Sequence, residues 1–300
     1  MLRGMFPALL TPFDADGGII EPALAALIDH NIDQGMQGFY AGGSTSEALL
    51  MAEPMRHRML DFVAETVARR VPVIANVGCI STQETVSLAR RAEAAGYDAV
   101  SFVPPYYYGF SLDEIRRHTL AVGEAVSIPV VLYNIPSASG VTFELDAILE
   151  MLEWDFVAGV KHTSHDLFML ERMKTAFPGK SVFVGHDEVL AGGLALGGDG
   201  GIGSTYTVLG PRILAVRDAI AAGDFAGALA HQRAINDVIQ TLIGCGVLQG
   251  LKTLLPDLGL EGGVCRAPFK PLTEAQATEL RAVFHRHFGS ALTPDRAVSA

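Results

Sequence analysis

Short hydrophobic runs and amphipathic segments alternate along the first two thirds of the chain. Each hydrophobic run is followed by polar, glycine or proline residues, and both of its faces are apolar, as in parallel strands covered by helices on both sides. The pattern predicts eight strands, at residues 5–10, 38–41, 71–77, 99–103, 130–133, 157–160, 182–184 and 201–204.

The segments between these strands carry apolar residues at helical spacing. In the first of them Leu24, Leu27, Ile28 and Ile32 form one stripe, which is typical of a helix packed on a sheet. The predicted helices span residues 21–34, 53–68, 82–95, 112–126, 143–152, 167–177, 187–196 and 209–221. We expect Gly96, Gly179 and Gly223 to end three helices as left-handed caps.

Eight strand–helix repeats are typical of a (β/α)8 TIM barrel, an α/β fold, and we assign residues 1–222 to it. An open doubly wound sheet is the structural alternative, but it seldom needs eight units. In residues 223–300 the hydrophobic pattern predicts helices only, at 225–242, 246–255 and 273–287. No strand and no low-complexity linker is predicted between them. We expect this C-terminal helical region to pack on the barrel.

Composition narrows the class of protein. The chain has 300 residues, 22 Lys and Arg against 33 Asp and Glu, and a net charge of −11, which disfavours a nucleic-acid partner. Mean hydropathy is +0.30, yet no run of 18 apolar residues predicts a membrane span, and the first residues do not resemble a signal peptide. Cys79, Cys245 and Cys265 are too scattered for a disulfide framework, so we expect a reducing cytoplasm.

Polar residues follow the predicted strands, where the mouth of a barrel gathers catalytic groups. Lys161 comes directly after a run that is apolar except for Gly159, and removal of its amine from water disfavours the charged form. A neutral amine can attack a ketone and form a Schiff base, which needs neither metal nor cofactor. The phenol of Tyr133, one strand away, can relay protons. A lysine snorkelling at a strand end and a core tyrosine are the structural alternatives.

Three further motifs bear on function. Residues 42–47 form a glycine-rich turn whose N–H groups, with Ser44 and Thr45, suit a carboxylate, although an ordinary tight turn is equally compatible. Residues 198–203 match the G-x-G-x-x-G fingerprint of dinucleotide-binding loops, but that fingerprint follows a strand and opens a helix. Here the residues follow a predicted helix and enter a predicted strand, so close packing inside the barrel explains the glycines better. The histidine pairs His162/His165 and His285/His287 lack a third ligand, and no metal site is predicted.

The chain resembles the dihydrodipicolinate synthase/N-acetylneuraminate lyase family of pyruvate-dependent class I aldolases over nearly its whole length. The resemblance rests on Gly43-Ser44-Thr45-x-Glu47, Tyr133-Asn134-Ile135-Pro136 and Gly159-Val160-Lys161. It implies a barrel with C-terminal helices, assembled as a homotetramer. It also implies that Lys161 forms the Schiff base, Tyr133 relays protons, and Ser44 and Thr45 hold the pyruvate carboxylate. Tyr107 resembles a tyrosine that reaches a neighbouring subunit's site.

Within the family the sequence is most similar to the lyase branch. The matching stretches are residues 40–45, 161–163, 185–188 and 200–206. This implies a carbon–carbon lyase that splits a 2-keto-3-deoxy sugar acid, with N-acetylneuraminate, giving pyruvate and N-acetylmannosamine, as the leading substrate. The residues implied to contact the sugar are Thr163, Gly185, Asp187, Glu188 and Ser204.

Alternative reactions remain within the same fold. Ser46 replaces the usual glycine of the carboxylate turn, and Leu248 and Gln249 replace an aromatic residue and a cation near the mouth. Because of these departures, an aldolase or a dehydratase that acts on a shorter sugar acid remains an alternative. The synthase activity is disfavoured because Ala138 stands where that branch carries an arginine. A non-catalytic barrel that senses a keto acid is the remaining alternative.

Overall fold

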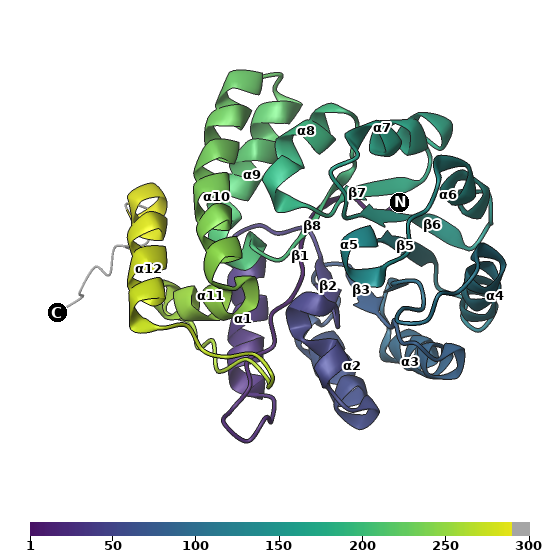
Figure 1. Cartoon of the computed structure of the whole chain (residues 1–300), viewed down its shortest axis with the longest axis horizontal. Helices are drawn as coiled ribbons and strands as arrows, with labels where there is room; N and C mark the ends of the chain where they lie inside the picture. Colours follow the sequence, from purple (N-terminus) through teal and green to yellow (C-terminus); the bar gives the residue numbers. More distant parts are fainter. Residues whose placement is uncertain (290–300) are drawn as a thin grey trace.

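The computed structural model describes residues 1–289, in which eight strands form one parallel sheet. The strands are β1 (Gly4–Pro7), β2 (Phe39–Ala41), β3 (Val73–Asn76), β4 (Ala99–Phe102), β5 (Val130–Asn134), β6 (Val157–His162), β7 (Ser181–Val184) and β8 (Gly200–Gly203). Their order is β1-β8-β7-β6-β5-β4-β3-β2. A parallel bridge between Ala8 and Tyr40 joins the two ends, so the sheet closes into the predicted TIM barrel (Figure 1).

Helices cover the outside of this barrel. They are α1 (Glu21–Asp33), α2 (Glu53–Val67), α3 (Thr82–Ala95), α4 (Leu112–Gly123), α6 (Leu145–Leu152), α7 (Leu167–Ala176), α8 (Leu190–Ala195) and α9 (Tyr206–Ala221). The single-turn helix α5 (Pro136–Ser139) follows β5 at the carboxyl end of the sheet (Figure 1). The short 3₁₀ helices are η1 (Ser44–Ser46), η2 (Ala48–Leu50), η3 (Asp187–Val189) and η4 (Leu255–Leu258). The C-terminal helices are α10 (Phe225–Cys245), α11 (Val247–Leu254) and α12 (Glu274–Phe288). The rest of the predicted region 223–300, residues 290–300, lies outside the described residues.

Every predicted strand and helix is present, with a few differences in detail. The expected helix 187–196 divides into η3 and α8, and the turn α5, which begins at Pro136, was not predicted. Gly96 and Gly223 have positive φ at helix ends, as expected. Gly179 was wrongly assigned as a cap, because α7 ends at Ala176 with Phe177 as its capping residue.

Strand alternation divides the core into two parts. Inward-facing residues of the strands form a small cluster inside the barrel, composed of Phe6, Ala8, Tyr40, Ile74, Ala99, Val131, Tyr133, Phe183 and Ile202. The outward-facing residues join the larger core under the helices. A side chain therefore reaches the barrel interior only at alternate positions of a strand.

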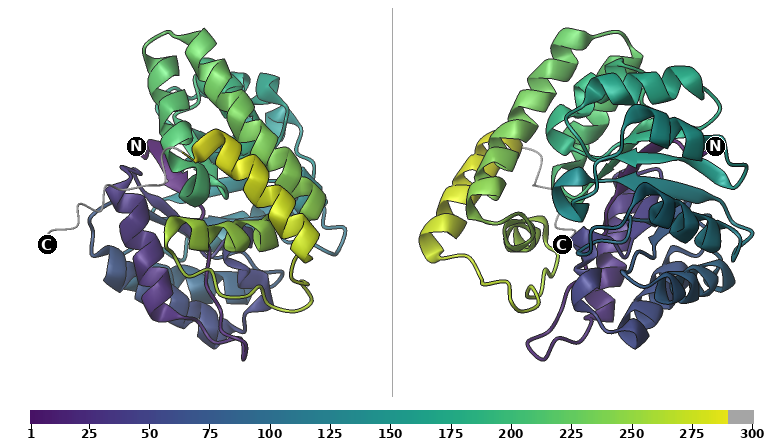
Figure 2. Two further views of the ribbon diagram at one scale, coloured as in Figure 1. Left: turned by 90° about the vertical axis from the view of Figure 1, so that its left-hand side faces the viewer. Right: turned by 45° about the vertical axis from the view of Figure 1, so that its right-hand side comes forward.

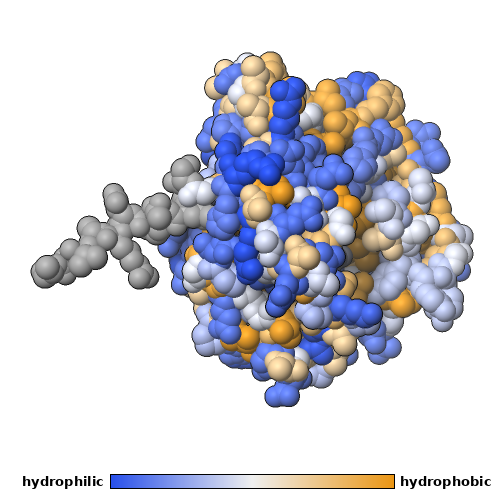
Figure 3. Space-filling model, turned by 60° about the vertical axis from the view of Figure 1, so that its left-hand side comes forward, coloured by the Kyte–Doolittle hydropathy of each residue, from blue (hydrophilic) through white to orange (hydrophobic). Residues whose placement is uncertain are grey.

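The C-terminal helices pack on one side of the barrel. Helix α10 lies along α9, and α12 lies along α10 (Figure 2). This side presents a mainly hydrophilic surface with scattered hydrophobic residues (Figure 3). Within residues 1–289 no single helix is long and apolar enough to span a membrane. Helix α10 and residues 247–258 meet such a test only as a pair, which is bent by 119°.

A buried ion pair fastens the C-terminal region to the loop after β2. Lys252 Nζ donates to Glu47 Oε1 at 2.6 Å, and the two side chains are only 3% and 0% exposed. The backbone N–H of Arg266 donates to the other carboxylate oxygen at 2.6 Å, and Lys252 Nζ also donates to the carbonyl of Val264. Glu47 has a φ of +57°, an uncommon left-handed conformation for a residue other than glycine. These long-range contacts hold the Ser44–Thr45 turn against α11.

We expect Lys252→Met to lower the free energy of unfolding by about 3–5 kcal/mol, because it leaves the Glu47 carboxylate buried without its cation. Urea unfolding followed by circular dichroism measures the change. Lys270→Met, at an exposed lysine, is the matched control. The double variant Glu47→Gln/Lys252→Met should lose less unfolding free energy than Lys252→Met alone. A single variant as stable as the control would contradict a structural role for the pair.

Candidate active site

The structure pairs Lys161 with Tyr133 at the carboxyl end of the sheet. Strands β5 and β6 place Tyr133 directly opposite Lys161, and both residues are 5% exposed. Lys161 lies inside β6, not after it as the sequence predicted, because the strand continues to His162. The amine is thus held within the barrel, near its mouth.

Two aromatic rings enclose this amine. Lys161 Nζ lies 4.2 Å from the ring centroid of Tyr40 and 4.1 Å from that of Tyr133. The two rings meet edge to face, with centroids 5.9 Å apart. Such an enclosure restricts the motion of the lysine and keeps most water away from its Nζ atom. A carbonyl carbon brought between the rings would meet a positioned nucleophile.

Tyr40 is fixed by its hydroxyl group. Asn76 Nδ2 donates to Tyr40 Oη at 2.7 Å, and that hydroxyl donates to Ser101 Oγ at 3.1 Å. Burial raises the pKa of Tyr40 well above its ordinary value, so the ring remains a neutral wall. No role was predicted for Tyr40 from the sequence. Its position in the alternation of β2, which faces it into the barrel, could have indicated one.

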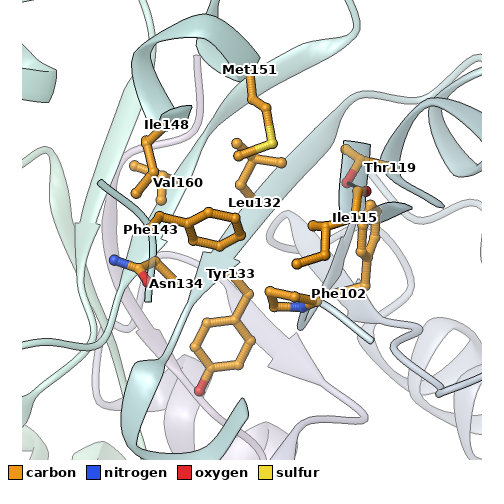
Figure 4. Close-up of a pocket in the computed structure, with 11 residues that line it drawn as sticks. Phe102, Ile115, Thr119, Leu132, Tyr133, Asn134, Phe143, Ile148, Met151 and Val160 are labelled. Atoms are coloured by element: carbon orange, nitrogen blue, oxygen red, sulfur yellow. Dashed lines mark hydrogen bonds between the residues drawn. The ribbon is translucent and has the colours of Figure 1, made fainter. Parts of the chain in front are cut away.

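Tyr133 differs from Tyr40 in its surroundings. Its ring points away from an apolar pocket behind β5, where Leu132, Phe143 and Met151 gather (Figure 4). Among residues 1–289 its hydroxyl has no hydrogen-bond partner, whereas Asn134, the next residue, faces outward and bonds His162. Tyr133 can therefore give or take a proton at a bound ligand.

The predicted carboxylate turn follows Tyr40. Gly43 packs on the Tyr40 ring, where a Cβ atom would come within 2.9 Å, and the η1 turn then presents Ser44 and Thr45. Ser44 is exposed and Thr45 is buried. The side chain of Ser46, which stands where the family carries a glycine, is hydrogen-bonded within the turn. Its hydroxyl donates to the carbonyl of Leu9 at 2.7 Å and accepts from the Gly42 N–H.

Several unpartnered polar atoms lie just beyond the lysine strand. Within the described chain, Thr163 Oγ1 and Asp187 Oδ1 are buried without a hydrogen-bond partner. Thr163 directly follows β6, and Gly185 follows β7 and has no Cβ because one would overlap the Thr163 hydroxyl. Ser204 follows β8. Buried polar atoms without partners are costly, so this region suits a hydroxyl-bearing ligand.

Asp187 is held at one oxygen only. Thr205 donates to Asp187 Oδ2 from its backbone N–H at 3.0 Å and from its hydroxyl at 2.7 Å. Burial raises the pKa of Asp187 to about 6, and the two hydrogen bonds from Thr205 oppose that shift. Because the folded-state pKa exceeds the ordinary value of 3.8, the protonated form stabilises the fold. That stabilisation is fully present below about pH 4 and is lost as pH rises through about 6.

We expect Asp187→Asn to abolish the loss of stability that accompanies ionisation of Asp187 as the pH rises, because an amide does not ionise. Between pH 4 and 7 the wild type should lose about 2 kcal/mol of unfolding free energy relative to the variant. Denaturant unfolding at a series of pH values measures the difference, with Asp16→Asn, at an exposed aspartate, as the control. A difference in unfolding free energy between wild type and Asp187→Asn that stays the same at every pH would contradict the prediction.

Glu188 lies beside two imidazoles. His186 Nδ1 is 3.1 Å and His165 Nε2 is 3.2 Å from the same oxygen, Glu188 Oε1. Burial alone would raise the pKa of Glu188, but the contacts with His186 and His165 prevail and lower it to about 2. His162, which lies close to His165 in the sequence, contacts Asn134 and the carbonyl of Asp166 instead of Glu188.

Tyr107 lies apart from these groups. Its side chain is 86% exposed, its φ is +76°, and its ring packs edge to face on Tyr108 at 5.1 Å. Tyr107 and the segment 137–141 line a groove between the loops after β4 and β5. Within one chain the structure therefore unites Lys161 and Tyr133 but leaves Tyr107 on the surface.

Known proteins are similar to this chain over most of its length. The Dihydrodipicolinate synthetase family matches residues 1–287. The N-acetylneuraminate lyase of Enterobacter sp. (strain 638) is 43% identical over 284 residues, which cover 94% of this chain and 96% of that protein. The N-acetylneuraminate lyase of Rhizobium meliloti (strain 1021) is 40% identical over 280 residues, 93% of each chain.

Solved structures agree with the fold. CdNal from Clostridium difficile, in complex with mannosamine, superposes with a TM-score of 0.93 at 35% identity and covers 96% of this chain and 100% of its own. N-acetylneuraminate lyase from Fusobacterium nucleatum, complexed with pyruvate, gives a TM-score of 0.90 at 33% identity, with 95% and 97% covered. The family match, the identities and the shared barrel lead to one conclusion: this chain belongs to the dihydrodipicolinate synthetase family.

Proposed function

We propose that this protein is a class I aldolase that cleaves N-acetylneuraminate to pyruvate and N-acetylmannosamine. The observation that carries the proposal is the Lys161 amine, enclosed by Tyr40 and Tyr133 at the carboxyl end of the barrel. The lyases that are 40–43% identical, and the relatives solved with mannosamine and with pyruvate, support the same substrate.

The reaction proceeds through intermediates that are bound covalently to Lys161. Lys161 Nζ attacks the C2 ketone of the open-chain sugar acid, and loss of water gives an iminium ion. Tyr133 donates the proton that leaves with this water and so becomes a phenolate. The phenolate then takes the proton of the C4 hydroxyl while the C3–C4 bond breaks, and the bonding electrons pass to the iminium as an enamine. The C4 fragment leaves as the aldehyde. Protonation of C3 and hydrolysis then release pyruvate and the free amine.

The other groups bind and orient the substrate. The turn with Ser44 and Thr45 receives the carboxylate, supported by its place directly after the Tyr40 strand. The unpartnered atoms of Thr163 and Asp187 receive sugar hydroxyl groups. Gly185, Glu188 and Ser204 complete the polyol site at the ends of β7 and β8.

The assembly extends this proposal. We assign a homotetramer in which Tyr107 supports Tyr133 of a neighbouring subunit, a role suited to its exposed position. A cytoplasmic location is consistent with the three free cysteines. The boundary between the barrel, 1–222, and the helical region, 223–300, is supported by the end of α9 at Ala221.

Reductive trapping tests the proposal. The protein is incubated with N-acetylneuraminate and cyanoborohydride, and the adduct is mapped by mass spectrometry. A pyruvate-sized adduct on Lys161 is expected. An adduct from pyruvate but not from N-acetylneuraminate would overturn the substrate and leave a shorter sugar acid. No adduct from either would overturn the Schiff-base chemistry.

A further inference from the structure

The rim of the barrel mouth carries a cluster that the proposed chemistry does not use as a unit. His165 lies in the loop after β6, while His186 and Glu188 lie in the loop after β7. One ligand atom from each residue falls within 4.8 Å of the others. The two imidazole rings are stacked, with centroids 4.4 Å apart and planes inclined by 10°. Two loops far apart in sequence thus bring two imidazoles and one carboxylate together.

The spacing of these atoms suits a shared cation. The distances from Glu188 Oε1 to the histidine nitrogens are 3.1 and 3.2 Å. Two ligands each about 2.1 Å from one zinc ion lie about 3.0 Å apart at a right angle and about 3.4 Å apart at a tetrahedral angle. The two separations from Glu188 fall between these values, and the two histidine nitrogens lie within 4.8 Å of each other. Because the imidazole rings are stacked, one ring must rotate before both nitrogens point at a shared ion.

The donor set indicates which ions would bind. Imidazole and carboxylate ligands together suit borderline divalent ions such as Zn²⁺, Co²⁺ or Ni²⁺, whereas Ca²⁺ and Mg²⁺ prefer oxygen ligands. The side chains of His165, His186 and Glu188 are 66%, 23% and 26% exposed, so an ion reaches them from solvent. Three protein ligands leave at least one position for water.

We propose that His165, His186 and Glu188 form a binding site for one divalent transition-metal ion at the rim of the barrel mouth. The ion is not part of the Schiff-base chemistry, which Lys161 and Tyr133 perform on the adjoining strands. Instead, the bound ion holds the Glu188 carboxylate and withdraws it from the polyol. This consequence rests on the proposed function, but the binding of metal does not.

Metal binding is tested on tag-free, full-length protein that has been treated with chelator and dialysed. Co²⁺ is titrated and followed by its visible absorption, and Zn²⁺ is titrated by calorimetry. We expect saturation at one ion per chain, without the thiolate charge-transfer band that Cys245 or Cys265 would produce. His165→Ala and His186→Ala should each weaken binding by about tenfold or more.

The matched control is His285→Ala, at a partly exposed histidine on α12 far from the cluster in sequence. It should bind Zn²⁺ as the wild type does. Circular dichroism confirms that each variant is folded. Absence of saturable binding, or equal affinity in the wild type and both cluster variants, would overturn the site.

The functional consequence has its own readouts. Zn²⁺ should lower the rate of pyruvate release from N-acetylneuraminate, EDTA should restore it, and His165→Ala should need more Zn²⁺ for the same inhibition. Trapping of free pyruvate on Lys161 should not change with Zn²⁺. Metal binding with no effect on sugar cleavage would overturn the inhibitory role. If the protein does not cleave the sugar at all, the proposed function fails, while the titrations still decide the metal site.

Discussion

Lys161→Met is expected to lower kcat for sugar-acid cleavage by about 10⁴-fold or more, because it removes the only atom that forms the Schiff base. Methionine keeps an unbranched apolar stem between the rings of Tyr40 and Tyr133, so the barrel interior should stay packed. Pyruvate release, coupled to lactate dehydrogenase and NADH, measures the rate. Cyanoborohydride should trap no adduct in this variant.

Lys270→Met serves as the control for loss of a lysine at an exposed position, and it should retain wild-type kcat. Thermal unfolding of both variants separates a catalytic loss from a folding defect. If folded Lys161→Met keeps kcat within about tenfold of wild type, the covalent mechanism is wrong and Lys161 has a structural role.

Tyr133→Phe is expected to lower kcat by about 10²- to 10⁴-fold with a smaller effect on KM, since it removes a proton relay while it keeps the ring. The contact of the ring with Lys161 and its edge-to-face packing on Tyr40 depend on the aromatic carbons and should remain. Steady-state kinetics over a range of pH measure the effect.

Tyr40→Phe provides a matched comparison, because it removes a hydroxyl from the opposite wall of the same amine. That hydroxyl bonds Asn76 and Ser101, so its loss should destabilise the fold by about 1–3 kcal/mol and change kcat less than Tyr133→Phe does. If the two variants lose the same kcat, Tyr133 acts as a wall of the enclosure and not as a proton relay.

The sequence alone determined the barrel and the place of its mouth. Hydrophobic periodicity is a local property, so eight apolar runs separated by amphipathic segments were sufficient to predict the strands, the helices and their alternation. Lys161 was recognisable because a lone charged residue at the end of an apolar run is costly to bury. The family motifs added the expected roles of Tyr133, Ser44 and Thr45, which the geometry accommodates and which await the experiments above.

Only the tertiary structure decided which side chains meet. Closure of the sheet brings Tyr40 from β2 across the interior to Lys161 on β6, a contact that no local spacing encodes. The buried pair of Glu47 and Lys252 joins residues 205 positions apart, and the cluster of His165, His186 and Glu188 joins two loops. Periodicity specifies which face of an element is buried. The strand register and the closure of the barrel specify which side chains that face meets, and both depend on the packing of the whole chain.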